Sequence, residues 1–144
     1  MIALVVFGIG MIGTAALMAT SIRDNNSAYL RTQAVFLANN MAERIRANLD
    51  GADEGEYDAI ALGSSGGTAA DCDWDAPCDF DALAANDEFE WKRMINQSLP
   101  NGQGSVTAQN TDPEVFLITV QWIEAATDDG NTAGTQTVVL ATHP

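Results

Sequence analysis

The residues best suited to chemistry are two cysteines in an acidic stretch. Cys72 and Cys78 lie in the segment DCDWDAPCDFD with C-x5-C spacing. A structural zinc site needs four ligands, and His143 is the only histidine that could join the two thiols. A catalytic thiol would need that one histidine, near the end of the sequence, as its oriented base. We therefore predict a disulfide, worth about 2 to 2.5 kcal/mol by loop entropy, in an oxidising compartment.

The aspartates around the cysteines are weaker candidates for a metal site. Asp71, Asp73 and Asp75 imitate the first ligands of an EF-hand loop. Ala76 stands where that loop requires glycine, and Ala82 stands where it requires a bidentate glutamate. These aspartates remain weak Ca²⁺ candidates, and the alternative is a solvated acidic loop. The sequence has no recognisable nucleophile–base pair, phosphate loop or metal triad, so we expect no enzyme, no cofactor and no small-molecule substrate.

Charge is abundant and unevenly placed. The formal net charge is -14, and every charged residue from Ala47 to Glu90 is acidic. Most of the basic residues precede this block, at Arg23, Arg31, Arg44 and Arg46. Such a surface repels phosphates, which argues against nucleic acid and anionic lipid headgroups as partners.

Residues 1–22 contain no charge, and Arg23 follows at once. About 20 apolar residues in a helix can cross a bilayer, whereas a signal peptide has a basic start and a shorter apolar core. We expect a retained membrane helix in which small residues allow close contact with other helices: Gly8, Gly10, Gly13 and Ala16. Flanking arginines alone would place the rest of the chain in the cytoplasm, but the cysteines favour an extracytoplasmic side.

An amphipathic helix is expected to continue directly from the apolar one. Its stripe has spacings of three and four and comprises Leu30, Ala34, Leu37, Met41, Ile45 and Leu49. Tyr29 and Phe36 flank the stripe, and Gly51 is a plausible stop. The pattern predicts one helix from about Ile2 to Leu49, on the order of 70 Å long.

The remaining residues predict a small head. Residues 50–70 are expected to form a loop with a flexible GSSGG segment. A short helix capped by Asn86 would bury Trp91, Met94 and Ile95, and residues 100–102 would end it. The strands GSVTAQ, VFLITVQWIEA and TQTVVLAT predict a meander of three or four antiparallel strands. One strand face would consist of Phe116, Ile118, Val120 and Trp122.

Parts of this sequence resemble a known family. The segments SAYLRTQA, residues 27–34, and NMAERIRAN, residues 40–48, are similar to the N-terminal helix of the type IV pilus modification protein PilV, a minor pilin family. EWKRMINQSLPNGQGSV and the later TVQW are similar to the body of that family.

The resemblance implies a pilin-like α+β fold with one long N-terminal helix packed on a small antiparallel sheet. Residues 1–22 would be the transmembrane and filament-core half of the helix, 23–49 its amphipathic half, and 50–144 a periplasmic head with an acidic disulfide loop. The implied residence is the bacterial inner membrane, as a single-pass protein, and then the pilus. The implied partners are membrane lipid, other minor pilins and the major pilin, in a tip complex that starts pilus assembly. Contacts between subunits would come from the small residues above and from Tyr29, Leu30, Leu37, Met41 and Ile45.

Prepilins carry a basic leader, a cleavage site after glycine and an early glutamate in the mature helix. Residues 1–22 contain none of these, so we expect this sequence to begin several residues inside the mature helix. Two alternatives remain open: a minor pseudopilin of a type II secretion system, and a membrane-anchored module that binds Ca²⁺ or another ligand.

Overall fold

A helix of 46 residues, α1 (Ile2–Ala47), opens the fold. The computed structural model describes residues 2–70, 72, 75, 77–109, 115–124 and 134–144. The chain divides into two compact units, Met1–Thr32 and Gln33–Pro144, which are described separately. The expected long helix is therefore present, and it ends two residues earlier than predicted.

Asn48 ends α1 and begins a second helix. Its backbone leaves the helical region (φ -123°), and its side chain accepts a hydrogen bond from the Gly51 amide, which caps α2 (Leu49–Asp53). Capping by asparagine satisfies an amide that the helix itself cannot. Gly51 is thus a buried residue inside α2 and not the predicted stop, and Leu49 is 52% exposed and not part of the stripe.

Within the described residues, no helix is long and apolar enough to cross a bilayer. The predicted membrane-spanning half of α1 is therefore not supported by the structure.

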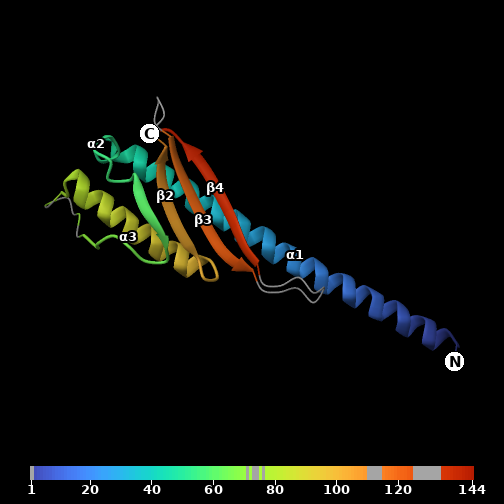
Figure 1. Ribbon diagram of the computed structural model, residues 1–144. Helices are drawn as coiled ribbons and strands as arrows, with labels where there is room; N and C mark the ends of the chain where they lie inside the picture. The colour runs from blue at the N-terminus through green and yellow to red at the C-terminus, as the bar shows by residue number, and fades with distance from the viewer. Residues whose placement is uncertain (1, 71, 73–74, 76, 110–114, 125–133) are drawn as a thin grey trace. The chain divides into compact units, whose positions relative to one another are not determined.

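The sheet has four antiparallel strands in the order β1-β2-β3-β4, as Figure 1 shows. The strands are β1 (Ala59–Gly63), β2 (Gln103–Gln109), β3 (Val115–Glu124) and β4 (Gly134–Thr142). The predicted antiparallel meander is confirmed, whereas β1 lies in the segment predicted to be a loop. The sequence AIALG is too short to show a clear alternation of apolar and polar residues, so it does not predict a strand. β1 forms because it pairs with β2.

One face of the sheet carries the core. Phe116, Ile118 and Val120 are fully buried and Trp122 is 2% exposed, as their alternation predicted. Burying such a side chain contributes about 1.5–3 kcal/mol. The part of α1 in the second unit adds a buried stripe made of Ala34, Leu37, Ala38, Met41, Ala42 and Ile45.

Helix α3 (Phe80–Ser98) starts earlier than the sequence pattern predicted. Asp79 caps it, so Asn86 lies inside the helix instead of at its start. Trp91 and Ile95 are fully buried as expected, whereas Met94 is only half-buried. The predicted stop is confirmed: Leu99 ends the helix and residues 100–102 form a turn.

Both long helices pack close to the sheet. The Trp91 indole Nε1 donates to the Leu37 carbonyl at 2.8 Å, which joins α3 to α1. A Cβ on Gly104 would lie 2.6 Å from Ile95 Cδ1 and from the Trp91 ring, so this glycine lets α3 approach β2. At the far end of the sheet, Arg46 of α1 donates to the Thr142 hydroxyl at 2.5 Å.

Candidate functional site

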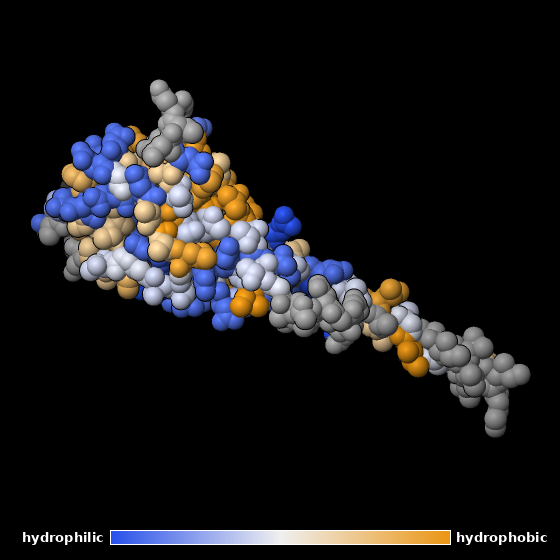
Figure 2. Space-filling model, viewed as in Figure 1, coloured by the Kyte–Doolittle hydropathy of each residue, from blue (hydrophilic) through white to orange (hydrophobic). Residues whose placement is uncertain are grey.

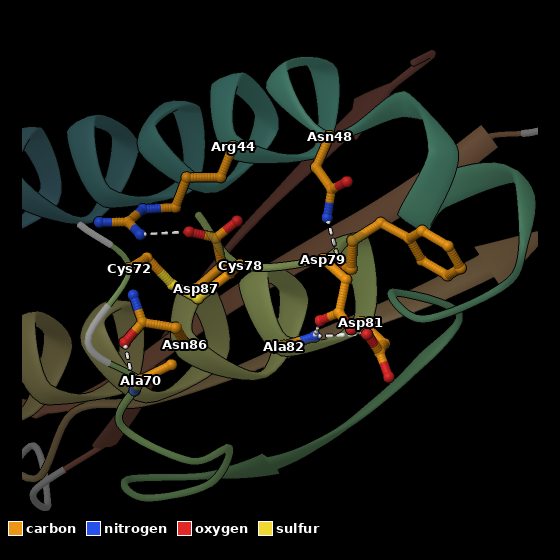
Figure 3. Close-up of a disulfide and its surroundings, with 11 residues drawn as sticks. Arg44, Asn48, Ala70, Cys72, Cys78, Asp79, Asp81, Ala82, Asn86 and Asp87 are labelled. Atoms are coloured by element: carbon orange, nitrogen blue, oxygen red, sulfur yellow. Dashed lines mark hydrogen bonds and ion pairs between the residues drawn. A yellow bond between two sulfur atoms is a disulfide. The ribbon is translucent and has the colours of Figure 1, made fainter. Parts of the chain in front are cut away.

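The predicted disulfide is present in the structure. Cys72 and Cys78 are bonded with their Cα atoms 5.1 Å apart, directly before the start of α3 (Figure 3). Cys72 is exposed and Cys78 is half-buried. Asp75 is also exposed, while Asp71 and Asp73 lie outside the described residues. Among the residues described, no group of three metal-ligating side chains is arranged to hold an ion.

The start of α3 carries two capping carboxylates. The Ala82 amide donates to Asp79 Oδ1 at 3.3 Å and to Asp81 Oδ1 at 2.9 Å. A hydrogen bond with Asp79, and then the Ala82 amide, lower the pKa of Asp81. Acidic residues at a helix start are favoured by the free amides there. These contacts give the acidic residues beside the disulfide a structural role.

A buried polar network lies between α1 and α3. Arg44 Nη1 contacts Asp87 Oδ1 at 2.6 Å, and the Tyr57 hydroxyl donates to Asp87 Oδ2 at 2.7 Å. The Asp87 side chain is only 8% exposed, so both of its oxygens are paired away from water. Arg44 also donates to Asn40 Oδ1 at 3.0 Å. Because a buried carboxylate is costly unless it is paired, the network fixes α3 against the end of α1.

Asn48 extends this network to the start of α3. Its Nδ2 donates to the Tyr57 hydroxyl at 3.1 Å and to the Phe80 carbonyl at 2.8 Å. Figure 3 shows Asn48 beside the start of α3. One amide therefore caps α2 and binds two other segments. Burial raises the pKa of Tyr57 and the hydrogen bond from Asn48 lowers it, while the hydrogen bond to Asp87 raises it further. The net shift is upward, so this phenol stays neutral in the folded protein.

Residues 63–70 form a strap that lies on α3, and its contacts with α3 were not predicted from the GSSGG pattern. The Lys92 ammonium is buried and donates to Ala61 O at 2.8 Å, to Ser65 O at 3.4 Å and to Glu88 Oε1 at 2.7 Å. The Thr68 amide donates to Ala85 O at 3.1 Å. The strap is therefore held by a buried charge and by backbone contacts.

Glycine is needed in the strap because the backbone lies against α3. Gly67 has φ +62°, and a Cβ there would collide with the Ala85 carbonyl. A Cβ on Gly66 would meet the end of the Glu88 side chain, which would have to shift, so the requirement for glycine is stricter at Gly67. The Ala70 amide then donates to Asn86 Oδ1 at 3.0 Å, which positions the chain just before the disulfide (Figure 3).

The residues predicted to mediate subunit contacts differ in exposure. Leu37, Met41 and Ile45 are buried in the second unit, and Leu30 is 8% exposed in the first. Tyr29 is exposed at 59%, and nothing lies within 4 Å of a Cβ placed on Gly8 or Gly13. Gly10 and Ala16 lie in α1, but their surroundings are outside what the structure describes.

Large apolar side chains of α1 are exposed instead. Six of them in the first unit are 60–73% exposed: Phe7, Met11, Ile12, Leu17, Met18 and Ile22. Val35 and Phe36, in the second unit, are also exposed. Exposed apolar surface of this extent is typical of an interaction site.

Sequence reasoning missed the network residues, although a signal for them exists. Asn48 lies three residues beyond Ile45 and continues the buried stripe of α1. Asp87 lies four residues before the buried Trp91, so helical periodicity places it on the buried face of α3. A polar residue on an apolar stripe indicates a buried polar contact, but it does not identify the partner.

A long N-terminal helix on a four-stranded antiparallel sheet, with a disulfide loop beside it, defines a pilin-like α+β fold. The model of the Tt1218-like family, described as type IV pilin Tt1218, matches residues 16–89. This chain belongs to that family of type IV pilins. The matched region includes the whole polar network and the disulfide. No curated protein matches the chain, and no solved structure matches it.

Proposed function

We propose that this chain is a minor pilin of the PilV kind, which promotes type IV pilus assembly within a tip complex. The observation that carries the proposal is the exposed apolar surface of α1 in the first unit. Ile12, Leu17 and Met18 are each more than 70% exposed. Membership of a type IV pilin family supports other pilins as the partners that cover this surface.

The same surface supports a membrane-anchored stage before assembly. Residues 1–22 are uncharged, and lipid would solvate their side chains until neighbouring pilin helices replace it. We propose residence in the inner membrane with the head in the periplasm, followed by transfer into the pilus. The disulfide supports an oxidising location for the head. We expect neither catalytic activity nor a cofactor requirement.

A deletion strain tests the role in assembly. Loss of the gene should strongly lower the number of pili counted by electron microscopy, and the wild-type gene should restore it. A normal number of pili would contradict the proposal. Normal pili together with failed protein secretion would instead support the alternative of a type II secretion pseudopilin.

A charge placed on the apolar surface tests how the helix acts. Ile12→Glu puts a carboxylate where the proposal requires lipid or another helix, so the variant should fail to restore pili. Asn26→Glu is the matched control, because Asn26 is an exposed polar residue of the same helix. Immunoblotting must show that both variants accumulate. Full rescue by Ile12→Glu would contradict a packing role for this surface.

A further inference from the structure

The two halves of the disulfide differ in their access to solvent. Cys72 is exposed, whereas Cys78, directly before the capping residue Asp79, is half-buried. Hydrophilic side chains dominate the visible surface around α2 and the start of α3, which suits a site that is reached from solvent (Figure 2). In thiol–disulfide exchange the incoming sulfur must reach one sulfur of the pair, so access decides which of the two reacts. Cys72 is therefore the half that a reagent in solution can approach.

Contacts other than the disulfide position both cysteines. Two residues before Cys72, the Ala70 amide donates to Asn86 Oδ1 of α3 at 3.0 Å (Figure 3). One residue after Cys78, Asp79 caps the same helix. Once α3 has docked, these contacts bring the two thiols close to each other before any bond joins them. The effective concentration of one thiol at the other is then high.

We propose that Cys72 is the entry sulfur of this disulfide, which exchanges with the disulfide of a separate oxidising protein, and that Cys78 resolves the mixed disulfide. This inference rests on the proposed periplasmic location of the head. The Cys72 thiolate attacks one sulfur of the partner's disulfide, an S–S bond forms between them, and the partner's other sulfur leaves as a thiolate. The Cys78 thiolate then attacks Cys72 Sγ, and the partner's first sulfur leaves. The chain loses two electrons and two protons, and the partner's disulfide becomes two thiols.

The half-burial of Cys78 suits the resolving role. A bulky protein disulfide must align with the sulfur that it attacks, and surrounding atoms restrict this at a half-buried residue. Cys72 needs no such access to Cys78, because the folded chain holds the two residues with their Cα atoms 5.1 Å apart. The order of events is therefore docking of α3, exchange at Cys72 and closure by Cys78.

Single-cysteine variants of the full-length chain, purified in detergent, test the order of attack. Cys78→Ala keeps only Cys72, and Cys72→Ala keeps only Cys78. The probe is hydroxyethyl disulfide, which is small and uncharged, and mass spectrometry follows the mixed disulfide over time. We expect Cys78→Ala to react faster than Cys72→Ala by on the order of tenfold when folded, and the two rates to become equal in urea. Equal rates when folded, a faster Cys72→Ala, or an undiminished difference in urea would overturn the proposal.

The reduced wild-type chain provides a second measurement that does not depend on how the variants fold. A short pulse of iodoacetamide followed by peptide mapping should label Cys72 before Cys78, and the reverse order would contradict the proposal. Circular dichroism checks that the reduced chain is folded.

Trapping in piliated cells tests the partner. Cys78→Ala should accumulate a reductant-sensitive adduct with an oxidising protein, because the resolving thiol is absent, whereas Cys72→Ala should not. Adducts with neither variant, or only with a second copy of this chain, would overturn the partner assignment. These outcomes are independent of the number of pili. If deletion of the gene leaves pili intact, the proposed function fails, whereas a slow Cys72 removes only this inference.

Discussion

Replacing Asp87 by alanine should remove about 3 kcal/mol of folding free energy. Asp87 is the shared acceptor for Arg44 and for the Tyr57 hydroxyl. Tyr57 is fully buried, so a phenolic proton without its acceptor costs about 1–3 kcal/mol. The Arg44 side chain is 25% exposed and keeps its bond to Asn40. Water can therefore hydrate the Arg44 guanidinium when Asp87 is absent. Loss of the ion pair then adds about 1 kcal/mol to the loss of stability, which is less than the full cost of an unpaired buried charge.

Urea unfolding of the purified full-length chain in detergent measures this loss. Tryptophan fluorescence and far-ultraviolet circular dichroism should give the same transition, because Trp91 lies in the core of the same unit. The matched control is Glu90→Ala on the same helix. Glu90 pairs with the half-exposed Arg93, so its removal should cost less than about 1 kcal/mol.

A double-mutant cycle with Tyr57→Phe separates the two partners of Asp87. In the phenylalanine background no phenol is left unsatisfied, so Asp87→Ala should cost about 1–2 kcal/mol less than it does alone. An Asp87→Ala loss no larger than that of Glu90→Ala would refute the reasoning, because the network would then contribute nothing beyond a surface pair.

Three further predictions concern the pH response, the strap and the disulfide. Burial raises the pKa of Tyr57 above its ordinary value of 10.0, so its contribution is complete below pH 10 and is lost as pH rises further. Above pH 10, urea titrations should show that the unfolding free energy of the wild type falls more steeply with pH than that of Tyr57→Phe, by at most about 1.4 kcal/mol per pH unit. Equal slopes for the two proteins would contradict a buried neutral phenol. Gly67→Ala should lower the unfolding free energy by roughly 2–4 kcal/mol, because alanine there would have a strained φ and would collide with the backbone. In the control Gly13→Ala, the added Cβ has no neighbouring atom within 4 Å, so the unfolding free energy should not fall. Equal losses in the two variants would refute the strap assignment. Replacing Cys72 and Cys78 by serine should lower the unfolding free energy by about 2 kcal/mol. The circular dichroism spectrum should not change, because the segments on both sides of the disulfide are held by other contacts. Loss of the cooperative transition would contradict this and would show that the disulfide holds the head together.

Local periodicity accounts for most of the elements that could be predicted. The stripe from Ala34 to Ile45 and the alternation from Phe116 to Trp122 both report burial on one face, and the structure buries them. The disulfide followed from composition, because two thiols and a single histidine leave few alternatives.

The missed features depend on residues distant in the sequence. β1 has a weak pattern of its own and is specified by its register with β2. Glycine and serine predicted flexibility for the strap and gave no signal for its contacts with Lys92, which lies on α3. Asp87 and Tyr57 could be recognised as a pair only once the fold had brought them within 2.7 Å. A single sequence indicates the local conformational propensity of a segment, whereas these features depend on its tertiary contacts.

The several bonds of Asn48 have a consequence for the order of folding. Its amide joins α2 to Tyr57 and to the carbonyl of Phe80, 32 residues further along the chain. A helix of five residues is not stable alone, so α2 can persist only after α3 has docked. The backbone amide hydrogens of α2 should then exchange with solvent only when the whole head unfolds, although α2 is one of the smallest elements of the fold. The turn after α1 would therefore be among the last parts of the head to form and would not guide α3 to its place.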